Sequence, residues 1–348
     1  MRPITLGALL AWAALVSLVT IGLRYRARGR SQDALVGLRV RMTTLAGAVG
    51  AVIAVLGNSV GDAASLWQLT ATPLVGVGVP AIAAGKSQVL AAGRYGDYDV
   101  DLFTALRAWA RYIGGMALIL TVLIVPVALV LSSTPLLTSR FGPVVVLALI
   151  VAGGLVLETA LPYLQRVMVP IRSTDRGAVA DGLAAVGRPD LPVCVQETQG
   201  NPIQRAYARG VGPTERLYLT DNVLDQTDRI VTATVAMGAA RTRTHVRHAG
   251  LVVILGVSGA GLSIVTGAPI PALFAFAVGL VAVALRWWAV VRADRIAADA
   301  LGRDAVTDAI RETTIGSDRS LAWSRRRECL RATPGPARRI DRLIAAGE

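Results

Sequence analysis

The chain consists of long apolar stretches separated by short, strongly basic segments. Seven of the apolar stretches are long enough, or nearly so, to cross the ~30 Å hydrocarbon core of a bilayer as α-helices. They cover residues 4–23, 43–60, 66–84, 113–132, 142–163, 250–267 and 269–291. This pattern predicts a polytopic α-helical membrane protein with about seven spans.

The composition agrees with this prediction. Hydrophobic residues make up 53% of the chain and charged residues 17%, and the mean hydropathy is +0.55. A soluble globular protein carries about a quarter of charged residues, because its surface must be covered. The composition therefore excludes a purely soluble protein.

The charges predict how the chain is oriented. The net charge of +13 comes from arginine clusters beside the apolar stretches, and residues 24–42 carry six arginines against one acid, Asp33. Because cytoplasmic loops are enriched in Arg and Lys, we expect this segment inside and the N-terminus outside the cell membrane. Following the spans, the polar segments 164–249 and 292–348 also fall in the cytoplasm. We expect the arginines to face membrane lipids, and no nucleic acid, because no aromatic-basic motif accompanies them.

The spans and charges together predict four regions. Residues 1–163 form an N-terminal membrane region with five spans, and residues 250–291 form a transmembrane helical hairpin. Residues 164–249 and 292–348 lie on either side of the hairpin and are expected to fold together into one small α+β cytoplasmic domain.

Local patterns predict elements within this cytoplasmic domain. VCVQE, from Val193, and ERLYLTD, from Glu215, are predicted strands bounded by turn residues. Asp221 or Asn222 is expected to cap a brief helix, and Asp228 a longer one. Their side chains can accept hydrogen bonds from the free N–H groups of a first helical turn.

The cysteines and histidines do not form a recognisable metal motif. The two cysteines, Cys194 and Cys329, lack C-x-x-C spacing, so neither a disulfide framework nor a thiolate metal site is expected. The two histidines, His245 and His248, could share one face of a predicted helix. No third ligand lies nearby and three arginines crowd the same turns, so a basic helix at the membrane boundary is the favoured interpretation.

Two further features are also weak. GVPAIAAGKS at 78–87 ends like a phosphate-binding loop, but Pro80 replaces its first glycine and offers no N–H to a phosphate. Polar residues inside the predicted spans are few, namely Asn58 and Glu158, and no paired acids mark a transport path. A transporter component is therefore a less favoured alternative.

Several cytoplasmic segments carry a family resemblance. In chain order they read AYARGVGP (206–213), RLYLTDNVLD (216–225), IVTATVA (230–236), VVRADRIAADALGRDA (290–305) and TPGPARRIDRL (333–343). In this order, and with two spans between the third and the fourth, they resemble the HtpX-type and CaaX-protease-type membrane zinc metalloproteases, which are gluzincins. The resemblance covers residues 193–348. It implies a metalloprotease-like domain interrupted by the hairpin and, in the family, a zinc cofactor.

The same resemblance implies that the zinc site is degenerate. The family's H-E-x-x-H motif falls on 237–241, where Met237 replaces the first His, Gly238 the general-base Glu and Arg241 the second His, and Val290 replaces the third ligand. Gly and Val offer no donor, the Met thioether is unsuited to this site, and Arg carries a permanent positive charge. We therefore predict that zinc is absent and that no catalytic residue is present.

In the family, the metal joins the helix of the H-E-x-x-H motif to the segment after the hairpin. Without the metal, another contact has to join these two elements. The resemblance places Asp294 beside the second histidine, the position that Arg241 occupies. We therefore predict a buried Arg241–Asp294 ion pair, which can connect two elements through two parallel hydrogen bonds.

These features favour a catalytically inactive relative of membrane zinc metallopeptidases that acts as a membrane scaffold or binds polypeptide partners. An active membrane protease or membrane-protein clients are the expected partners beside lipids. Two alternatives stay open. One is an active HtpX-type zinc metalloendopeptidase, which the missing ligands disfavour, and the other is an unrelated multi-span protein such as a transporter component.

Overall fold

The computed structural model describes the chain in segments. They are residues 3–26, 169–198, 203–246, 248–250, 269–317, 319–325, 328 and 333–345, with scattered positions between 103 and 166 and at 252, 253 and 256. The predicted spans at 43–60, 66–84 and 113–132 lie outside these residues. Those at 142–163 and 250–267 are described only at scattered positions. The chain divides into two compact units, one reaching from the N-terminus to Gly142 and one containing most of the remaining chain.

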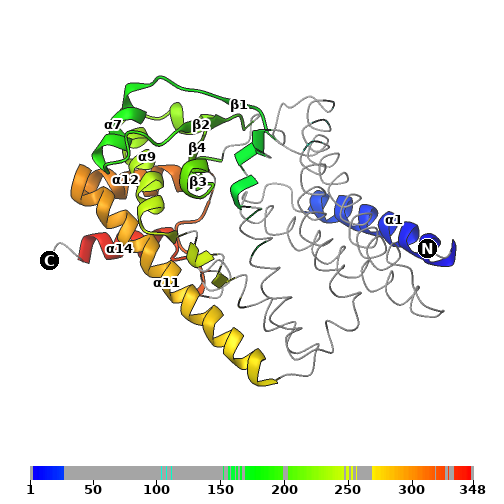
Figure 1. Ribbon diagram of the computed structural model, residues 1–348. Coiled ribbons are helices and arrows are strands. Elements are labelled where there is room, and N and C mark those ends of the chain that lie inside the picture. The colour runs from blue at the N-terminus through cyan, green and yellow to red at the C-terminus, as the bar shows by residue number, and fades with distance from the viewer. Residues whose placement is uncertain are drawn as a thin grey trace. The chain divides into compact units, whose positions relative to one another are not determined.

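Two described helices correspond to predicted spans. In the first unit, α1 (Pro3–Arg26) covers the stretch 4–23. In the second, α11 (Pro269–Leu301) contains the stretch 269–291 and continues beyond it without a break (Figure 1). Among the residues that the structure describes, Ala275–Leu301 of α11 is long and apolar enough to cross a membrane. The predicted hairpin and the predicted cytoplasmic segment after it are thus joined by one continuous helix.

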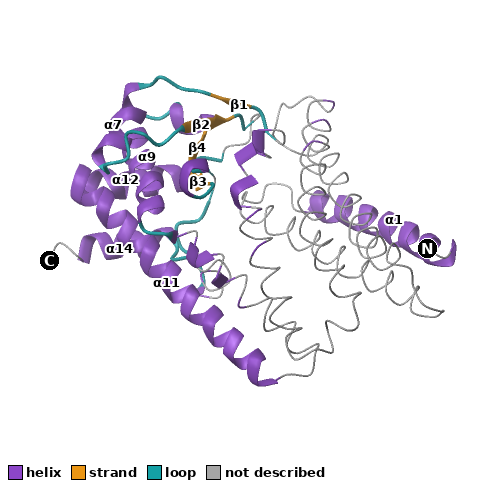
Figure 2. Cartoon of the chain, in the orientation of Figure 1, coloured by secondary structure: helices purple, strands orange, loops and turns teal. Residues whose placement is uncertain are grey.

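A small mixed sheet lies in the second unit (Figure 2). Its strands are β1 (Ile171–Arg172), β2 (Val193–Gln196), β3 (Ala206–Arg209) and β4 (Arg216–Thr220), in the order β1-β2-β4-β3. The pair β2–β4 is parallel, whereas β1 pairs with β2, and β3 with β4, in antiparallel fashion. The strands predicted from VCVQE and ERLYLTD are confirmed as β2 and β4. The edge strands β1 and β3 were not predicted.

Helix α9 (Asp228–Arg243) is the central element of this unit. It packs against α7 (Gly177–Ala185), α11, α12 (Arg303–Ile315), β3 and β4. Because it has neighbours on several sides, every residue from 233 to 240 is buried, and most of them are small. Helix α14 (Pro336–Ala345) packs against α11 and α12 and brings the C-terminal segment to the same core. Two short elements, η1 (Gly212–Thr214) and α8 (Asp221–Leu224), flank β4.

The predicted helix caps are wrong by one residue. Asp228 is the first residue of α9, and Thr227 occupies the cap position. The Asp228 carboxylate instead accepts hydrogen bonds of 2.6 and 3.0 Å from Arg176, which connects the starts of α7 and α9. Asp221 is likewise the first residue of α8, and its carboxylate accepts a hydrogen bond from the backbone N–H of Thr198. The Asp228 carboxylate is thus used between segments, whereas that of Asp221 also accepts a hydrogen bond of 2.9 Å from the backbone N–H of Asn222 in its own helix.

A close approach in the hairpin depends on glycine. A Cβ atom added to Gly256 would lie 2.7 Å from the Cα atom of Gly279 in α11 and 2.8 Å from the carbonyl oxygen of Ala275. Small residues permit this kind of close backbone contact between membrane helices. The predicted span 250–267, which is rich in glycine, therefore contacts α11 at Gly256.

Candidate functional site

Two of the four predicted zinc-site positions, Met237 and Arg241, lie where α9, α11 and α14 meet. Met237 and Arg241 are one helical turn apart on α9, so their side chains share a face. Met237 is almost fully buried. Asp294 on α11 and Arg339 on α14 approach this face from segments that follow the hairpin.

A buried ion pair occupies this junction. The Nε atom of Arg339 donates to Oδ2 of Asp294 at 2.7 Å, and Nη2 of Arg339 donates to Oδ1 at 2.8 Å. Asp294 is 1% exposed. The same Nη2 atom also donates to the Sδ atom of Met237 at 3.5 Å. One guanidinium therefore connects α9, α11 and α14, in a bidentate geometry typical of strong Arg–carboxylate pairs.

The predicted Arg241–Asp294 pair is corrected to an Arg339–Asp294 pair. The two carboxylate oxygens of Asp294 are both taken by Arg339, because α14 brings that guanidinium edge-on to the carboxylate. Arg241 lies close enough to be influenced by the charge of Asp294, but its buried Nε has no hydrogen-bond partner. Asp294 therefore forms a buried ion pair with Arg339 and not with Arg241.

The charges at the junction perturb the two arginines differently. Burial lowers the pKa of Arg241 to about 10; the like charge of Arg339 lowers it further, and the charge of Asp294 acts in the opposite direction. Burial would also lower the pKa of Arg339, but the adjacent Asp294 carboxylate raises it above its ordinary value. Both guanidiniums are thus charged at neutral pH, and the junction holds two cations and one anion.

Gly238, at the predicted position of the general base, lies directly against the sheet. A Cβ atom added there would be 2.8 Å from Cβ of Ala206 on β3 and 2.8 Å from Cδ1 of Leu217 on β4. Real Cβ atoms essentially never approach other atoms so closely. The space that a longer side chain would need at this position is filled by the core.

Val290, at the predicted position of the third ligand, belongs to an apolar cluster. It lies one turn before Asp294 on α11, is 4% exposed, and packs with Val246 and Ala289. No polar atom of its side chain can contribute to the junction. His245 and His248 lie just beyond the C-terminus of α9, with their rings edge to face at 5.1 Å, and both are exposed.

The groups at the junction do not match the donors that a zinc ion prefers. Zinc sites use thiolate, imidazole and carboxylate groups. Here the carboxylate of Asp294 is bonded to Arg339, and its neighbours are a thioether and the second guanidinium of Arg241. Within the described part of the chain, no three His, Cys, Asp or Glu side chains gather in a way that could hold a metal ion.

Sequence reasoning missed two arginines near this site. Arg339 lies in the segment 333–343 that carries the family resemblance, but it was not singled out as a partner for Asp294. Arg286 lies inside the predicted span 269–291, yet only Asn58 and Glu158 were named as polar residues within spans. A charged residue inside an apolar span is costly and usually functional, so this signal could have identified Arg286.

Comparisons with known proteins give a structural relationship. No protein-family model matches the sequence, and no curated protein matches it. The fold matches the crystal structure of S. mikatae Ste24p with a TM-score of 0.56 and 12% sequence identity, over 99% of this chain and 99% of that chain. At this identity the match establishes the fold alone. The chain therefore has a Ste24p-like fold, with helices and a small mixed sheet in its described part.

Proposed function

We propose that the protein is a catalytically inactive relative of membrane zinc metalloproteases that acts as a membrane scaffold or binds polypeptide partners. The observation that carries this proposal is the Arg339 guanidinium, which bonds to both Asp294 and Met237 at the position of the predicted zinc site. Both oxygens of the Asp294 carboxylate are bonded to Arg339, and the facing side of α9 offers a thioether and a second guanidinium, so these residues gather no donor set for a divalent cation.

The relationship to Ste24p supports the ancestry in this proposal. The match covers 99% of both chains, so the segments that resemble membrane zinc metalloproteases lie within the shared fold. Similar folds host different activities, so the residues at the site decide the chemistry. Hydrolysis of a peptide by a zinc enzyme needs a metal-bound water and a general base. Neither Gly238 nor Val290 can supply a ligand or a base, and Arg241 brings positive charge to the second His position.

The predicted topology is part of the proposal. The protein would lie in the cell membrane with its N-terminus outside and the α/β unit in the cytoplasm. There it could contact membrane-protein clients or a catalytically complete membrane protease. The outer edge of β3, which pairs with no other described strand, is one place where an extended segment of a partner could add a strand, since edge strands present unpaired backbone groups.

Metal content and proteolysis test the catalytic part of the proposal. The full chain is purified in detergent, its zinc is measured by mass spectrometry, and casein cleavage is followed with and without added Zn²⁺. We expect no stoichiometric zinc and no cleavage, while an authentic zinc endopeptidase in the same detergent cleaves casein. Stoichiometric zinc together with chelator-sensitive cleavage would overturn the proposal.

Affinity capture tests the scaffold part. A tagged full chain is purified from native membranes beside an unrelated multi-span protein with the same tag. We expect a catalytically complete membrane metallopeptidase, or defined membrane-protein clients, to be enriched with this chain alone. Equal recovery of all proteins with both baits would reject the scaffold role.

A further inference from the structure

Among the residues of the second unit that the structure describes, three buried guanidinium nitrogens have no hydrogen-bond partner. They are the Nε atoms of Arg209 at the end of β3, Arg241 on α9 and Arg286 on α11. Buried donors in proteins are nearly always hydrogen-bonded, because an unpaired donor costs free energy. Three such donors from three neighbouring elements form an unusual concentration of unused hydrogen-bonding capacity.

The three arginines also form an excess of positive charge. Arg286 is close enough to Arg209, and Arg241 close enough to Arg286 and Arg339, for their like charges to interact. The one carboxylate that reaches Arg241 is Asp294, which is already bonded to Arg339. In the described part of the chain, no salt bridge neutralises Arg209, Arg241 or Arg286.

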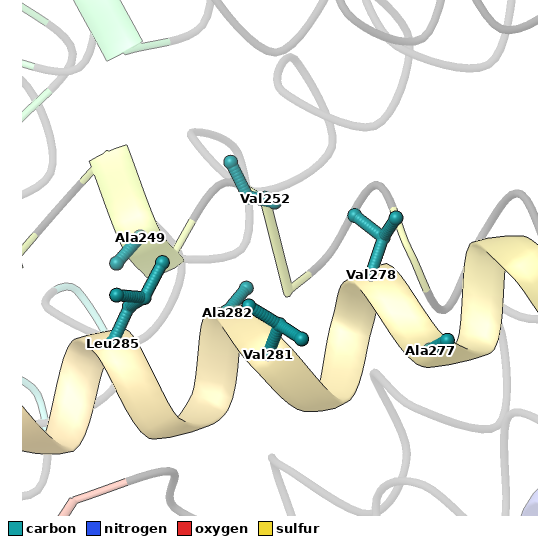
Figure 3. A pocket seen from close by; sticks show the side chains of 7 residues that line it. All are labelled: Ala249, Val252, Ala277, Val278, Val281, Ala282 and Leu285. Atoms are coloured by element: carbon teal, nitrogen blue, oxygen red, sulfur yellow. The ribbon is translucent and has the colours of Figure 1, made fainter.

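An apolar pocket of about 420 Å³ lies next to one of these arginines. Figure 3 shows Leu285 of α11 and Ala249 at one end of the pocket and Val278 toward the other. Arg286 directly follows Leu285 and lies one turn after Ala282, another lining residue. Its guanidinium lies 3.4 Å from the position of a Cβ added to Gly250, the residue after Ala249. The arginine is therefore placed at the Leu285 end of the pocket.

We propose that Arg286, Arg241 and Arg209 bind the phosphate of an anionic phospholipid headgroup, with an acyl chain of the same lipid in the adjacent pocket. A phosphate offers more acceptor oxygens than a carboxylate and suits several guanidiniums at once. Basic pockets beside membrane helices are known to recognise lipid headgroups. The lining of the pocket is apolar, as a hydrocarbon chain requires, and α11 is itself long and apolar enough to span a membrane.

The site would also resolve the electrostatic imbalance at the helix junction. A bound phosphate supplies the negative charge that the two cations and one anion around Asp294 lack. It would accept hydrogen bonds from buried donors that otherwise have no partner.

Lipid titration of the full-length protein tests the proposal. The chain in a neutral detergent is titrated with dioleoylphosphatidylglycerol, dioleoylphosphatidylcholine or inorganic phosphate, and binding is read by native mass spectrometry and by the unfolding midpoint. Arg286→Gln is compared with Arg292→Gln. Arg292 is an exposed arginine on the same helix that stacks on Trp288, so both variants remove the same charge.

We expect phosphatidylglycerol to bind and to raise the unfolding midpoint, and phosphatidylcholine to bind more weakly because its headgroup is zwitterionic. Arg286→Gln should weaken phosphatidylglycerol binding roughly tenfold or more, as loss of a charge-assisted hydrogen bond implies, and Arg292→Gln should leave it unchanged. If Arg286→Gln does not fold in the neutral detergent, Arg209→Gln is expected to give the same loss of phosphatidylglycerol binding. Equal affinities for the Gln variants at 286 or 209 and at 292 would overturn the proposal. Tight binding of inorganic phosphate, with no advantage for the lipid, would overturn the lipid assignment.

Discussion

Removing the Asp294 carboxylate tests the buried tie at the helix junction. Asp294→Asn keeps the size of the side chain but removes the charge that two guanidiniums share, those of Arg339 and Arg241. Breaking a buried ion pair from one side costs about 3–5 kcal/mol, because the remaining charge is left uncompensated. For a unit of 150–250 residues each kcal/mol lowers the unfolding midpoint by roughly 2–4 °C. The expected fall is therefore about 6–20 °C.

Removing the arginine of this ion pair should lower the stability less than removing the aspartate does. In Arg339→Gln the Asp294 carboxylate is left near Arg241, whose unpaired guanidinium can turn towards it. The free energy of unfolding of Arg339→Gln is therefore expected to fall by the lower end of the same range, about 3 kcal/mol. The double variant Asp294→Leu with Arg339→Met removes both charges and should recover most of the stability, since apolar groups can replace a buried pair at little cost.

Thermal unfolding of the purified full chain, followed by circular dichroism, measures these differences. Asp308→Asn is the matched control, because Asp308 pairs with Arg229 at 3.2 Å on the surface and its side chain is 39% exposed. Such an exposed pair contributes about 0–1 kcal/mol. If Asp294→Asn and Asp308→Asn lower the midpoint equally, the Asp294–Arg339 pair stabilises the fold no more than a surface pair does, and the prediction is wrong.

Five further substitutions, two of them controls, have defined outcomes in urea or thermal unfolding. Arg241→Met should stabilise the protein in neutral detergent by about 1–3 kcal/mol, because burial lowers the pKa of this arginine to about 10 and the charge is penalised in the fold. Arg243→Met, two residues further along α9, should instead lose stability, since its Nη1 donates to a backbone carbonyl at 2.7 Å. Gly238→Ala should cost about 1–3 kcal/mol by overpacking against the sheet, whereas Gly177→Ala, with open space around its Cβ, should cost nothing. Glu328→Gln should loosen the C-terminal segment by about 1–3 kcal/mol and increase its cleavage by protease, because this buried carboxylate pairs with an arginine at 2.8 Å.

The sequence allowed the main architecture to be predicted where the signals are local. Helices α1 and α11 follow from long apolar runs, and β2 and β4 from short β-branched and aromatic runs between turns. Strand β3 was not predicted because AYAR has no marked alternation. It becomes a strand by pairing with β4, a long-range contact that a local pattern does not contain.

The pairing at the site could not be predicted for a related reason. The resemblance singled out Asp294, but two arginines compete for its carboxylate, and sequence position favoured Arg241 over Arg339. The outcome depends on how α14 packs on α11 and α12, which brings Arg339 to the carboxylate with both nitrogens aligned. Arg241 is excluded from that geometry although it lies on the neighbouring helix face.

If an ion pair between side chains joins these helices, the stability of the protein should not change when a chelator is added. In a protein whose helices are held by zinc, removing the ion removes a contribution that reaches about 10–16 kcal/mol in structural sites. Here the Arg339–Asp294 pair connects the same three helices through hydrogen bonds. Prolonged dialysis against EDTA is therefore expected to leave the unfolding midpoint unchanged, while Asp294→Asn lowers it in the same assay. A fall in the midpoint after EDTA, reversed by Zn²⁺ and absent from Asp294→Asn, would mean that a metal and not the guanidinium joins these helices.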